Sequence, residues 1–351
     1  MRPADLSNHI SEWFDGSGPG ADIVISSRIR LARNLAGFEF LSKLTPQRQS
    51  QVLKKLKEAI LSLDVGDELF FVDIEQASSL ERDLLVERHL ISRQHAAGRG
   101  PRAAAIARAE SFTAMINEED HLRIQVLQPG LQLKKCWEEI NRIDDSIEQQ
   151  VEYAFSATCG YLTACPTNLG TGIRVSVMLH LPGLKMTGQI EKFFNAARDT
   201  DLMVRGLFGE GTEAVGDFFQ LSNQVTLGIA ETAVIADFSE KIVPKIVEYE
   251  KQARAKLLDQ QANALDDKIQ RALGVLKNAR LISSQEALFL LSHVRMGVNL
   301  KRIQNISISA INELFMLTQP AHLQLNSGKQ LDPNQRDAMR AQIIRSRLCQ
   351  N

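Results

Sequence analysis

The stretch Asn117-Glu118-Glu119-Asp120-His121-Leu122-Arg123 joins two segments that have the pattern of β-strands. Residues 112–116 are mostly apolar, and apolar and polar residues alternate from 121 to 126, which is typical of a strand buried on one face. The sequence therefore predicts a hairpin with three acidic side chains at its tip. Such a cluster is tolerated best beside a cation, a metal or a cationic substrate. A solvated acidic turn explains the same residues, so this stretch alone leaves both interpretations open.

A further strand is predicted at residues 22–33, where Arg28 and Arg30 project from one face. Two guanidinium groups on one face suit a polyphosphate, because each makes bidentate contacts and stays charged at any working pH. A polar edge strand is the alternative interpretation. The same pattern recurs farther along the chain on one face of another predicted strand, at Arg174, Ser176 and Met178.

The loop between residues 160 and 174 carries a cysteine, Cys165, among hydroxyl and amide side chains. Pro166, Gly170 and Gly172 exclude a helix here. A free cysteine is most often an inert buried residue, and only an electropositive setting converts it into a thiolate. The spacing alone does not decide between these two roles.

The composition of the 351 residues is that of an ordinary globular protein, with 44% apolar and 24% charged residues. With 41 basic and 42 acidic residues, the chain has no global field that would favour nucleic acid or an anionic membrane as a partner. No apolar run approaches the roughly 18 residues of a transmembrane helix, and no signal pattern opens the chain, so we expect a cytoplasmic protein. The four cysteines have neither zinc-site nor disulfide-framework spacing, so no metal site is predicted.

The remaining segments divide into two predicted domains, residues 1–235 and 236–351, because long, highly charged helical patterns begin near Ala236. Residues 1–20 predict a flexible entry segment without chemistry, and residues 93–108 predict a mobile basic loop. In the first domain, helices are predicted at 46–63, 80–90, 131–155 and 189–197, and strands at 69–74, 202–207 and 218–227.

The arginines on predicted strands occur together with two acidic turns, the second at residues 210–213. This combination resembles the catalytic domain of the phosphagen kinases, the guanidino kinase family, over roughly residues 22–235. Its signatures are residues 117–123 and Cys165-Pro166-Thr167-Asn168-Leu169-Gly170-Thr171. The resemblance implies an α+β fold, with an antiparallel sheet flanked by helices, followed here by an all-α C-terminal domain. It also implies ATP, with Mg²⁺ carried by the nucleotide because no cluster of protein ligands for the ion is evident.

The resemblance also implies roles for individual residues. The catalytic carboxylates of the family match Glu119 and Glu210, and its reactive cysteine matches Cys165. Its phosphate-binding arginines match five arginines here, and a histidine at the nucleotide matches His89. The complete predicted ATP-binding set is Ser26, Ser27, Arg28, Ile29, Arg30, His89, Arg123, Arg174, Val175, Ser176, Val177, Met178, Arg205, Gly206, Leu207, Phe208, Gly209 and Glu210.

Two departures point to one branch of that family. Phosphagen kinases carry an N-terminal helical domain that closes over a small substrate, whereas here the arginine strand begins at residue 22 and a helical domain follows the catalytic one. Both features resemble the bacterial protein-arginine kinases, which phosphorylate arginine side chains of proteins. Their C-terminal Arg-Asp-x-x-Arg-Ala motif implies an allosteric phosphoarginine pocket at Arg336, Asp337, Arg340 and Ala341. An exposed helix with an Asp337 to Arg340 ion pair is the alternative.

The expected chemistry follows from the basicity of arginine, whose side chain stays protonated to a pH above about 12. A carboxylate must orient the guanidinium and accept its proton, and we assign this role to Glu119, with Glu210 as a second clamp. A thiolate at Cys165 would add negative charge beside the substrate. A kinase of free arginine or another small guanidine is one alternative, and a nucleotide-sensing adaptor without catalysis is another.

The expected partners come from analogy with the family alone. They are protein substrates with exposed arginine, a Clp ATPase or protease, a stress repressor and an activator protein. The helical domain makes a homodimer the expected assembly.

Overall fold

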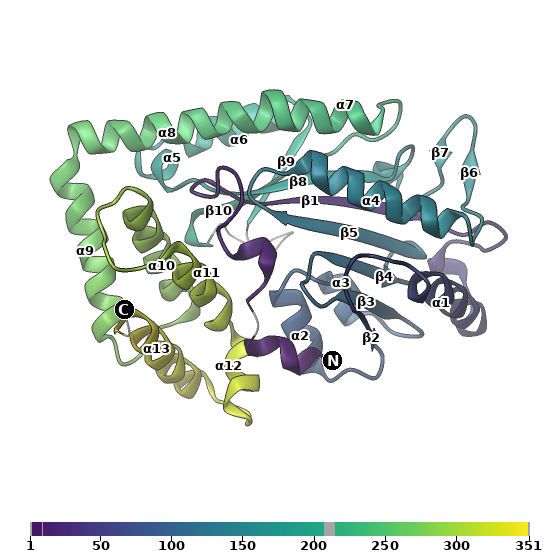
Figure 1. Cartoon of the computed structure of the whole chain (residues 1–351), viewed down its shortest axis with the longest axis horizontal. Helices are drawn as coiled ribbons and strands as arrows, with labels where there is room; N and C mark the ends of the chain where they lie inside the picture. The colour runs from purple at the N-terminus through teal and green to yellow at the C-terminus, as the bar shows by residue number, and fades with distance from the viewer. Residues whose placement is uncertain (1, 9, 207–214, 350–351) are drawn as a thin grey trace.

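The computed structural model describes residues 2–8, 10–206 and 215–349, and its centre is an eight-stranded sheet (Figure 1). Every strand pair described in this sheet is antiparallel, which confirms the predicted α+β fold. In spatial order the strands are β2 (Leu69–Asp73), β3 (Ala103–Ala107), β4 (Phe112–Ile116), β5 (Leu122–Pro129), β1 (Val24–Arg33), β8 (Ile173–His180), β10 (Phe218–Asn223) and β9 (Leu202–Gly206).

One face of the sheet is covered by helix α4 (Leu133–Glu148), which packs against β1 and β5 (Figure 1). Its buried residues recur every three or four positions, as the sequence predicts, and each fully buried Leu or Ile stabilises the fold by roughly 1.5–3 kcal/mol. The helix ends earlier than expected. Phe155 lies instead in a small hairpin of β6 (Phe155–Ser156) and β7 (Gly160–Tyr161).

Some of the other helices of the first half begin at recognisable caps. The hydroxyl of Thr45 accepts a hydrogen bond from the backbone of Arg48 at the start of α1, and Ser78 and Glu81 form a capping box at the start of α2. The other helices of this half are α1 (Pro46–Leu61), α2 (Ser79–Glu87), α3 (Arg93–Ala97), α5 (Pro182–Met186) and α6 (Ile190–Asp199).

The alanine-rich stretch within residues 93–108 is not a mobile loop, and that prediction is wrong. Residues 103–107 form β3, an inner strand paired with β2 and β4, and each is at most 1% exposed. Alternate side chains enter two apolar clusters, Ala105 in the main core and Ile106 in a smaller one beside Leu84. Alanine has a low strand propensity, but small side chains allow both faces to be covered closely, so packing overrides propensity.

The segment at residues 1–20 is also more ordered than predicted. It contains two short 3-10 helices, η1 (Pro3–Asn8) and η2 (Glu12–Phe14), and the side chains of Leu6, Trp13 and Phe14 are buried. The segment lies between the sheet and the C-terminal helices α11 (Ile308–Leu317) and α12 (Pro320–Ser327), as Figure 1 shows in purple. Burial of these large apolar side chains offsets the entropy lost on ordering the chain.

The polypeptide continues as helix through residue 236, in α7 (Glu231–Ala236), a π-helical segment η6 (Asp237–Ile242) and α8 (Val243–Gln260). Apolar residues up to Ala253 join the core of the sheet, whereas Leu257 joins the core of the C-terminal helices. The boundary at 235/236 stays a prediction. The remaining helices are α9 (Ala262–Asn278), α10 (Ser284–Asn299) and α13 (Pro333–Cys349). Among the described helices, none is long and apolar enough to cross a membrane.

Candidate active site

The pairing of four strands brings arginine side chains together on one face of the sheet. Arg30 of β1 lies directly opposite Arg174 of β8, and Arg28 lies opposite Ser176. Cross-strand partners project to the same face, so the face continues to Arg123, which pairs with Ala32, and to Arg205, which pairs with Gln220. The structure thus gathers all five predicted arginines, from β1, β5, β8 and β9, on one surface. We call this surface the arginine face.

The arginines of the arginine face lie close enough to one another that their charges lower the pKa of Arg28 and Arg30. Burial, together with Arg174, Arg205 and Arg123, lowers the pKa of Arg28 to about 10. The pKa of Arg30 is also well below its ordinary value, because of burial and the neighbouring arginines, and Glu118 opposes this shift only in part. Crowded and partly desolvated cations raise the free energy of the protein unless an anion comes to them. The arrangement therefore favours a highly charged anion such as a polyphosphate.

The three acids at the tip of the β4–β5 hairpin have different roles. Asp120 is fully buried and accepts hydrogen bonds from the Asn34 side chain and the backbone of Ala164, each at 2.7 Å, so it is structural. Glu118 is buried and pairs with Arg123, and the Ser92 hydroxyl donates to it at 2.5 Å.

The pKa of Glu118 is lower than its ordinary value. Burial alone would raise this pKa, but the charge of Arg123 and the hydrogen bond from Ser92 lower it, with further help from Arg30 and His95. Glu118 therefore remains an ionised partner of Arg123 and is not suited to accept a proton.

Glu119 is the acid at this tip that solvent reaches. Its side chain is 32% exposed, and one of its oxygens lies 2.7 Å from an Arg123 nitrogen. A guanidinium group thus already contacts this carboxylate within the protein. A carboxylate that is exposed, ionisable and located at the edge of the arginine face is placed to meet a second guanidinium from outside.

His121, in the same signature, is a structural residue. Its Nδ1 accepts a hydrogen bond from the backbone of Leu35 at 3.0 Å, and its Nε2 donates to the carbonyl of Glu39 at 2.9 Å. Burial lowers its pKa to about 4, so the ring is neutral at physiological pH. It ties the hairpin to the chain that follows β1.

The Cys165 loop is anchored beside the acidic hairpin. The bond between Asp120 and Ala164 joins the residue after Glu119 to the residue before Cys165. The Cys165 sulfur lies 3.0 Å from the Thr167 hydroxyl, on a 3-10 turn at Pro166–Asn168. Two candidate catalytic residues from distant parts of the sequence are therefore held in one region.

Gly170 in this loop permits a close backbone approach. Its φ is +103°, and a Cβ atom there would lie 2.8 Å from the Cα of Leu227 and from the carbonyl oxygen of Thr226. The Thr226 hydroxyl in turn donates to the carbonyls of Thr167 and Leu169, at 3.0 and 2.6 Å. The segment after β10 thus fixes the Cys165 loop, and only glycine fits at this position.

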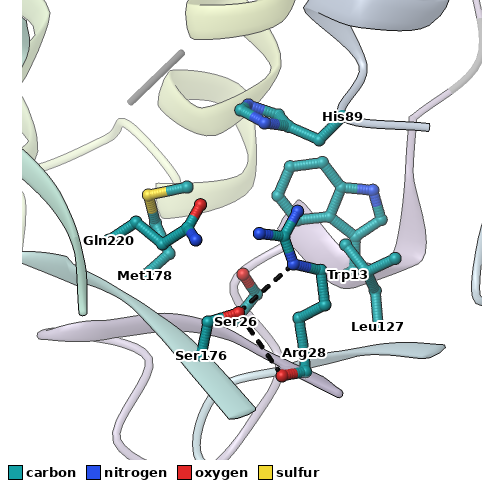
Figure 2. A pocket seen from close by; sticks show the side chains of 8 residues that line it. All are labelled: Trp13, Ser26, Arg28, His89, Leu127, Ser176, Met178 and Gln220. Atoms are coloured by element: carbon teal, nitrogen blue, oxygen red, sulfur yellow. Dashed lines mark hydrogen bonds between the residues drawn. The ribbon is translucent and has the colours of Figure 1, made fainter. Parts of the chain in front are cut away.

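A pocket opens at the end of the arginine face that lies farthest along β1 from Glu119. Figure 2 shows the Arg28 guanidinium directed toward Trp13 and His89, with its Nε donating to Ser176 at 3.2 Å. His89 has a φ of 59°, and the side chain of Gln125 donates to its carbonyl at 2.9 Å. Burial and nearby Arg28 and Arg93 lower the pKa of His89 to about 3. A neutral imidazole thus lines this pocket.

Not every residue of the predicted ATP-binding set presents its side chain to this face. The structure places the side chains of Ser26, Ser176 and Met178 in the pocket beside Arg28. Gly206 ends β9 and pairs with Phe219 of β10. The predicted residues Leu207, Phe208, Gly209 and Glu210 lie outside the described residues.

Four residues of the predicted ATP-binding set have side chains that point away from the arginine face, so their place in the set stays a prediction that only backbone contacts could fulfil. The Ser27 hydroxyl is fully buried and donates to the carbonyl of Gly130. Ile29, Val175 and Val177 are at most 1% exposed in the apolar core of the opposite face. Each is adjacent in sequence to a residue of the arginine face, and neighbours along a strand project to opposite sides. Only their backbone atoms remain available.

Trp13 was not predicted as a site residue. It lies in η2, in the segment expected to be flexible, yet it lines the same pocket as Arg28 and His89 (Figure 2). No local pattern signals a binding role for it. Two large adjacent aromatic side chains, Trp13 and Phe14, signal only that this segment buries apolar surface.

The predicted phosphoarginine motif lies on α13. Arg340 is 2% exposed, and its guanidinium donates to the carbonyls of Thr318 and Ile282, at 2.8 and 2.9 Å, and to Asp337 at 2.5 Å. Arg336 donates to the carbonyl of Leu331. The Asp337 to Arg340 pair is thus present, as in the alternative interpretation, and Ala341 is buried in the helical core. The phosphoarginine pocket stays a prediction.

Among the described residues, no group of three His, Cys, Asp or Glu side chains is placed to hold a metal ion.

Comparison with known proteins supports the same family from sequence and from structure. The model described as ATP:guanido phosphotransferase, C-terminal catalytic domain, matches residues 51–253, and the model described as protein-arginine kinase McsB C-terminal domain matches residues 262–351. The protein-arginine kinase of Brevibacillus brevis is 46% identical over 346 residues, covering 98% of this chain and 96% of that one. The protein-arginine kinase of Halothermothrix orenii is 43% identical over 349 residues, covering 99% of both chains.

Solved structures share the catalytic fold. A lombricine kinase superposes with a TM-score of 0.60 at 26% identity, covering 71% of both chains. The duplicated taurocyamine kinase from Schistosoma mansoni gives a TM-score of 0.62 at 27% identity, over 68% of this chain and 34% of that one. Taken with the family matches and with relatives similar along nearly their whole length, these findings show that the chain belongs to the ATP:guanido phosphotransferase family, in the branch of the protein-arginine kinases.

Proposed function

We propose that this protein transfers the terminal phosphoryl group of Mg-ATP to the guanidinium group of arginine side chains in other proteins. The observation that carries the proposal is the position of Glu119, a partly exposed carboxylate at one end of a face lined with arginines. The guanidinium acceptor needs a carboxylate and the phosphate donor needs cations, so the two substrates can meet where a carboxylate adjoins the arginines.

The strand register suggests how a nucleotide would run along the face. The Glu119 end of β1 is at Ala32, which pairs with Arg123. The middle is at Arg30, which pairs with Arg174, and the pocket end is at Arg28, which pairs with Ser176. Four residues of extended strand span about 13 Å. The phosphates would lie across the arginines, with the terminal phosphate nearest Glu119 and the base toward Trp13 and His89.

The arginine face can perform most of the catalysis by electrostatics. In phosphoryl transfer the bond from phosphorus to the leaving oxygen breaks as the bond to the incoming nitrogen forms, and charge spreads over the transferred oxygens. Arginines held by strands are preorganised around that charge and need no rearrangement during the reaction.

Glu119 supplies the proton acceptor. A guanidinium nitrogen has no free electron pair until its proton leaves, and a carboxylate within hydrogen-bond reach can take that proton as the nitrogen–phosphorus bond forms. Arg123 already shows how a guanidinium binds this carboxylate, at 2.7 Å. On substrate binding, the incoming arginine takes a position beside the same group, and ADP leaves with the electron pair of the broken bond.

Two observations favour a polypeptide over a small guanidine as acceptor. The relatives that match along nearly the whole chain are protein-arginine kinases, and their characteristic C-terminal domain model matches residues 262–351. Glu119 and the Cys165 loop also lie at the surface, where a protein segment can reach them. The small-guanidine kinases among the solved structures share only part of the chain at lower identity.

The test is to incubate the protein with Mg-ATP and a basic protein and to identify acid-labile phosphate on arginine. Glu119→Gln should lower transfer by about 10²–10⁴-fold, the usual contribution of a general base, with little change in ADP affinity. Glu248→Gln, on the exposed side of α8, is the matched control and should keep full activity.

The alternatives predict different products. Efficient phosphorylation of free arginine without any on protein would replace the proposal by a small-guanidine kinase. ATP binding without transfer to either acceptor would indicate a nucleotide-sensing adaptor.

The partners remain predictions by family analogy, which is the only ground for proposing a Clp ATPase or protease, a stress repressor and an activator protein. The homodimer and the cytoplasmic location remain predictions from the sequence.

A further inference from the structure

We infer that Trp13, from the N-terminal segment, is a nucleotide-binding residue that contacts the base. This inference rests on the proposed function, because it presumes that the arginine face binds a nucleoside polyphosphate. It goes further in assigning part of the site to a segment that precedes the strands of the sheet.

The composition of the pocket suits an aromatic heterocycle. Trp13, Leu127 and Met178 supply apolar surface, whereas the side chains that can donate or accept hydrogen bonds include Ser26, Ser176 and Gln220 (Figure 2). The flat faces of a base need apolar or aromatic neighbours, and its edge needs a small number of polar groups.

The pocket also has the right place along the site. Arg28 lines it, and Arg30, Arg174 and Arg123 lie on the side toward Glu119. Arg205 lies at the level of the pocket, because it pairs with Gln220, which lines it. A nucleotide whose terminal phosphate lies near Glu119 extends its base along the face toward this pocket. The rings of Trp13 and His89 lie edge to face, with centroids 5.5 Å apart, so Trp13 also supports the imidazole.

The indole itself is an unusual choice for a purely structural residue. Trp13 is 2% exposed, and its Nε1 has no hydrogen-bond partner among the residues that the structure describes. A buried indole nitrogen usually finds an acceptor, and leaving it without one lowers stability. Phenylalanine or leucine would fill the core without that penalty, whereas the indole leaves a donor that a ligand in the pocket can satisfy.

The fold holds this tryptophan firmly in place. On one side of it, the Ser11 hydroxyl donates to Glu110 at 2.6 Å and accepts from Arg88 at 2.8 Å. On the other side, the carbonyl of Phe14 accepts a hydrogen bond from the Asn312 side chain of α11 at 2.8 Å. The segment is thus fixed to the catalytic half and to the C-terminal helices, and Trp13 presents a rigid surface to the pocket.

The test separates the base from the phosphates by comparing two probes, Mg-ADP and Mg-tripolyphosphate. Trp13→Ala should weaken Mg-ADP binding about tenfold, within the range of one base–aromatic contact, and should leave tripolyphosphate binding unchanged. The KM for ATP should rise by a similar factor while kcat changes little. Trp13→Phe, which keeps an aromatic face, should restore most of the affinity.

Fluorescence provides a second readout that does not depend on the alanine variant folding. The chain has two tryptophans, and Trp137 lies on α4, which covers the opposite face of the sheet. In a Trp137→Phe variant, the emission of Trp13 should change on adding Mg-ADP and much less on adding Mg-tripolyphosphate. In a Trp13→Phe variant, Mg-ADP should produce little change.

Equal affinities of Trp13→Ala and wild type for Mg-ADP would overturn the inference, and so would an equal loss of affinity for both probes, which indicates a structural role. An emission of Trp13 that does not respond to Mg-ADP would also overturn it. These outcomes differ from failure of the proposed function, in which the wild-type protein itself would transfer no phosphate to arginine.

Discussion

Two groups of arginines in this protein differ in the acceptors that surround them. On the arginine face, Arg28 and Arg30 lie beside other arginines, and burial together with like charge lowers the pKa of both. Near the C-terminal helices, Arg295 is fully buried, and burial together with the nearby Arg254 lowers its pKa to about 9. Arg295, however, donates to the Asn312 side chain at 3.0 Å and to the carbonyls of Ala21 and Asp22, at 2.6 and 3.1 Å.

The difference shows how the same side chain can serve binding or stability. A buried cation that is supplied with acceptors links distant segments, as Arg295 joins α10 to the chain before β1. Cations crowded against one another lower stability and persist where a ligand with the opposite charge compensates. Replacing members of the two groups should therefore separate activity from stability.

The largest effect is expected at the centre of the arginine face. Arg30→Gln should lower kcat/KM for phosphoryl transfer by on the order of 10³-fold, as when a phosphate-binding arginine is removed from other phosphotransferases. The melting temperature should stay the same or rise, because repulsion from Arg28, Arg123 and Arg174 is relieved. Activity assays and thermal unfolding measure the two quantities. A lower melting temperature with unchanged activity would place Arg30 among the structural arginines.

The converse is expected for the buried arginine near the C-terminal helices. Arg295→Gln should reduce the free energy of unfolding by about 3–5 kcal/mol, because it removes the donor from several buried acceptors. Arg302, in an exposed ion pair with Asp266, is the matched control, and Arg302→Gln should shift the denaturation midpoint only slightly. If both variants unfold at the same denaturant concentration, the comparison between the two groups fails.

Burial without a compensating charge also affects a histidine, His121, which burial keeps neutral. Burial lowers the pKa of His121 to about 4, so between pH 6.5 and 4 the unfolded chain binds a proton that the folded protein does not. Stability present above pH 6.5 is therefore lost as the pH falls toward 4, by on the order of 3 kcal/mol for this residue.

His121→Gln can keep the hydrogen bonds to Leu35 and Glu39 without titrating. Denaturant unfolding at several pH values should show a flatter slope for this variant than for wild type. Parallel slopes would mean that His121 is not neutral in the fold.

The smallest effect is the stabilisation expected when an anion binds to the arginine face. Mg-tripolyphosphate at a hundred times its dissociation constant should stabilise the wild-type protein by about 2.7 kcal/mol. The rise in melting temperature should be smaller in Arg28→Gln, because one cation of the face is missing, and unchanged in Arg302→Gln. An equal rise in all three proteins would show that the anion binds elsewhere.

Much of the arginine face was predictable because a strand has a simple period. Alternation placed Arg28 and Arg30 on one side of β1 and Arg174 and Ser176 on one side of β8, and the register confirms both pairs. The same rule, applied residue by residue, would have excluded the side chains of Ile29 and Val175 from the binding set.

The errors arose where tertiary packing overrode local preference. Residues 93–108 are rich in Ala, Arg and Gly and were predicted as a mobile loop, yet neighbouring strands and two apolar clusters make residues 103–107 an inner strand. Of the three adjacent acids, only contacts from distant segments distinguish Asp120 and Glu118, which are bound within the protein, from the exposed Glu119.

The sequence by itself determined most of the strands, the hairpin and the presence of both signatures, because period and turn chemistry act between residues that are close along the chain. The tertiary structure alone decided which acid faces the solvent, and it brought Trp13 to the pocket of Arg28 and His89. Those outcomes depend on contacts between segments far apart in sequence, and no local pattern encodes which distant segment will supply the neighbour.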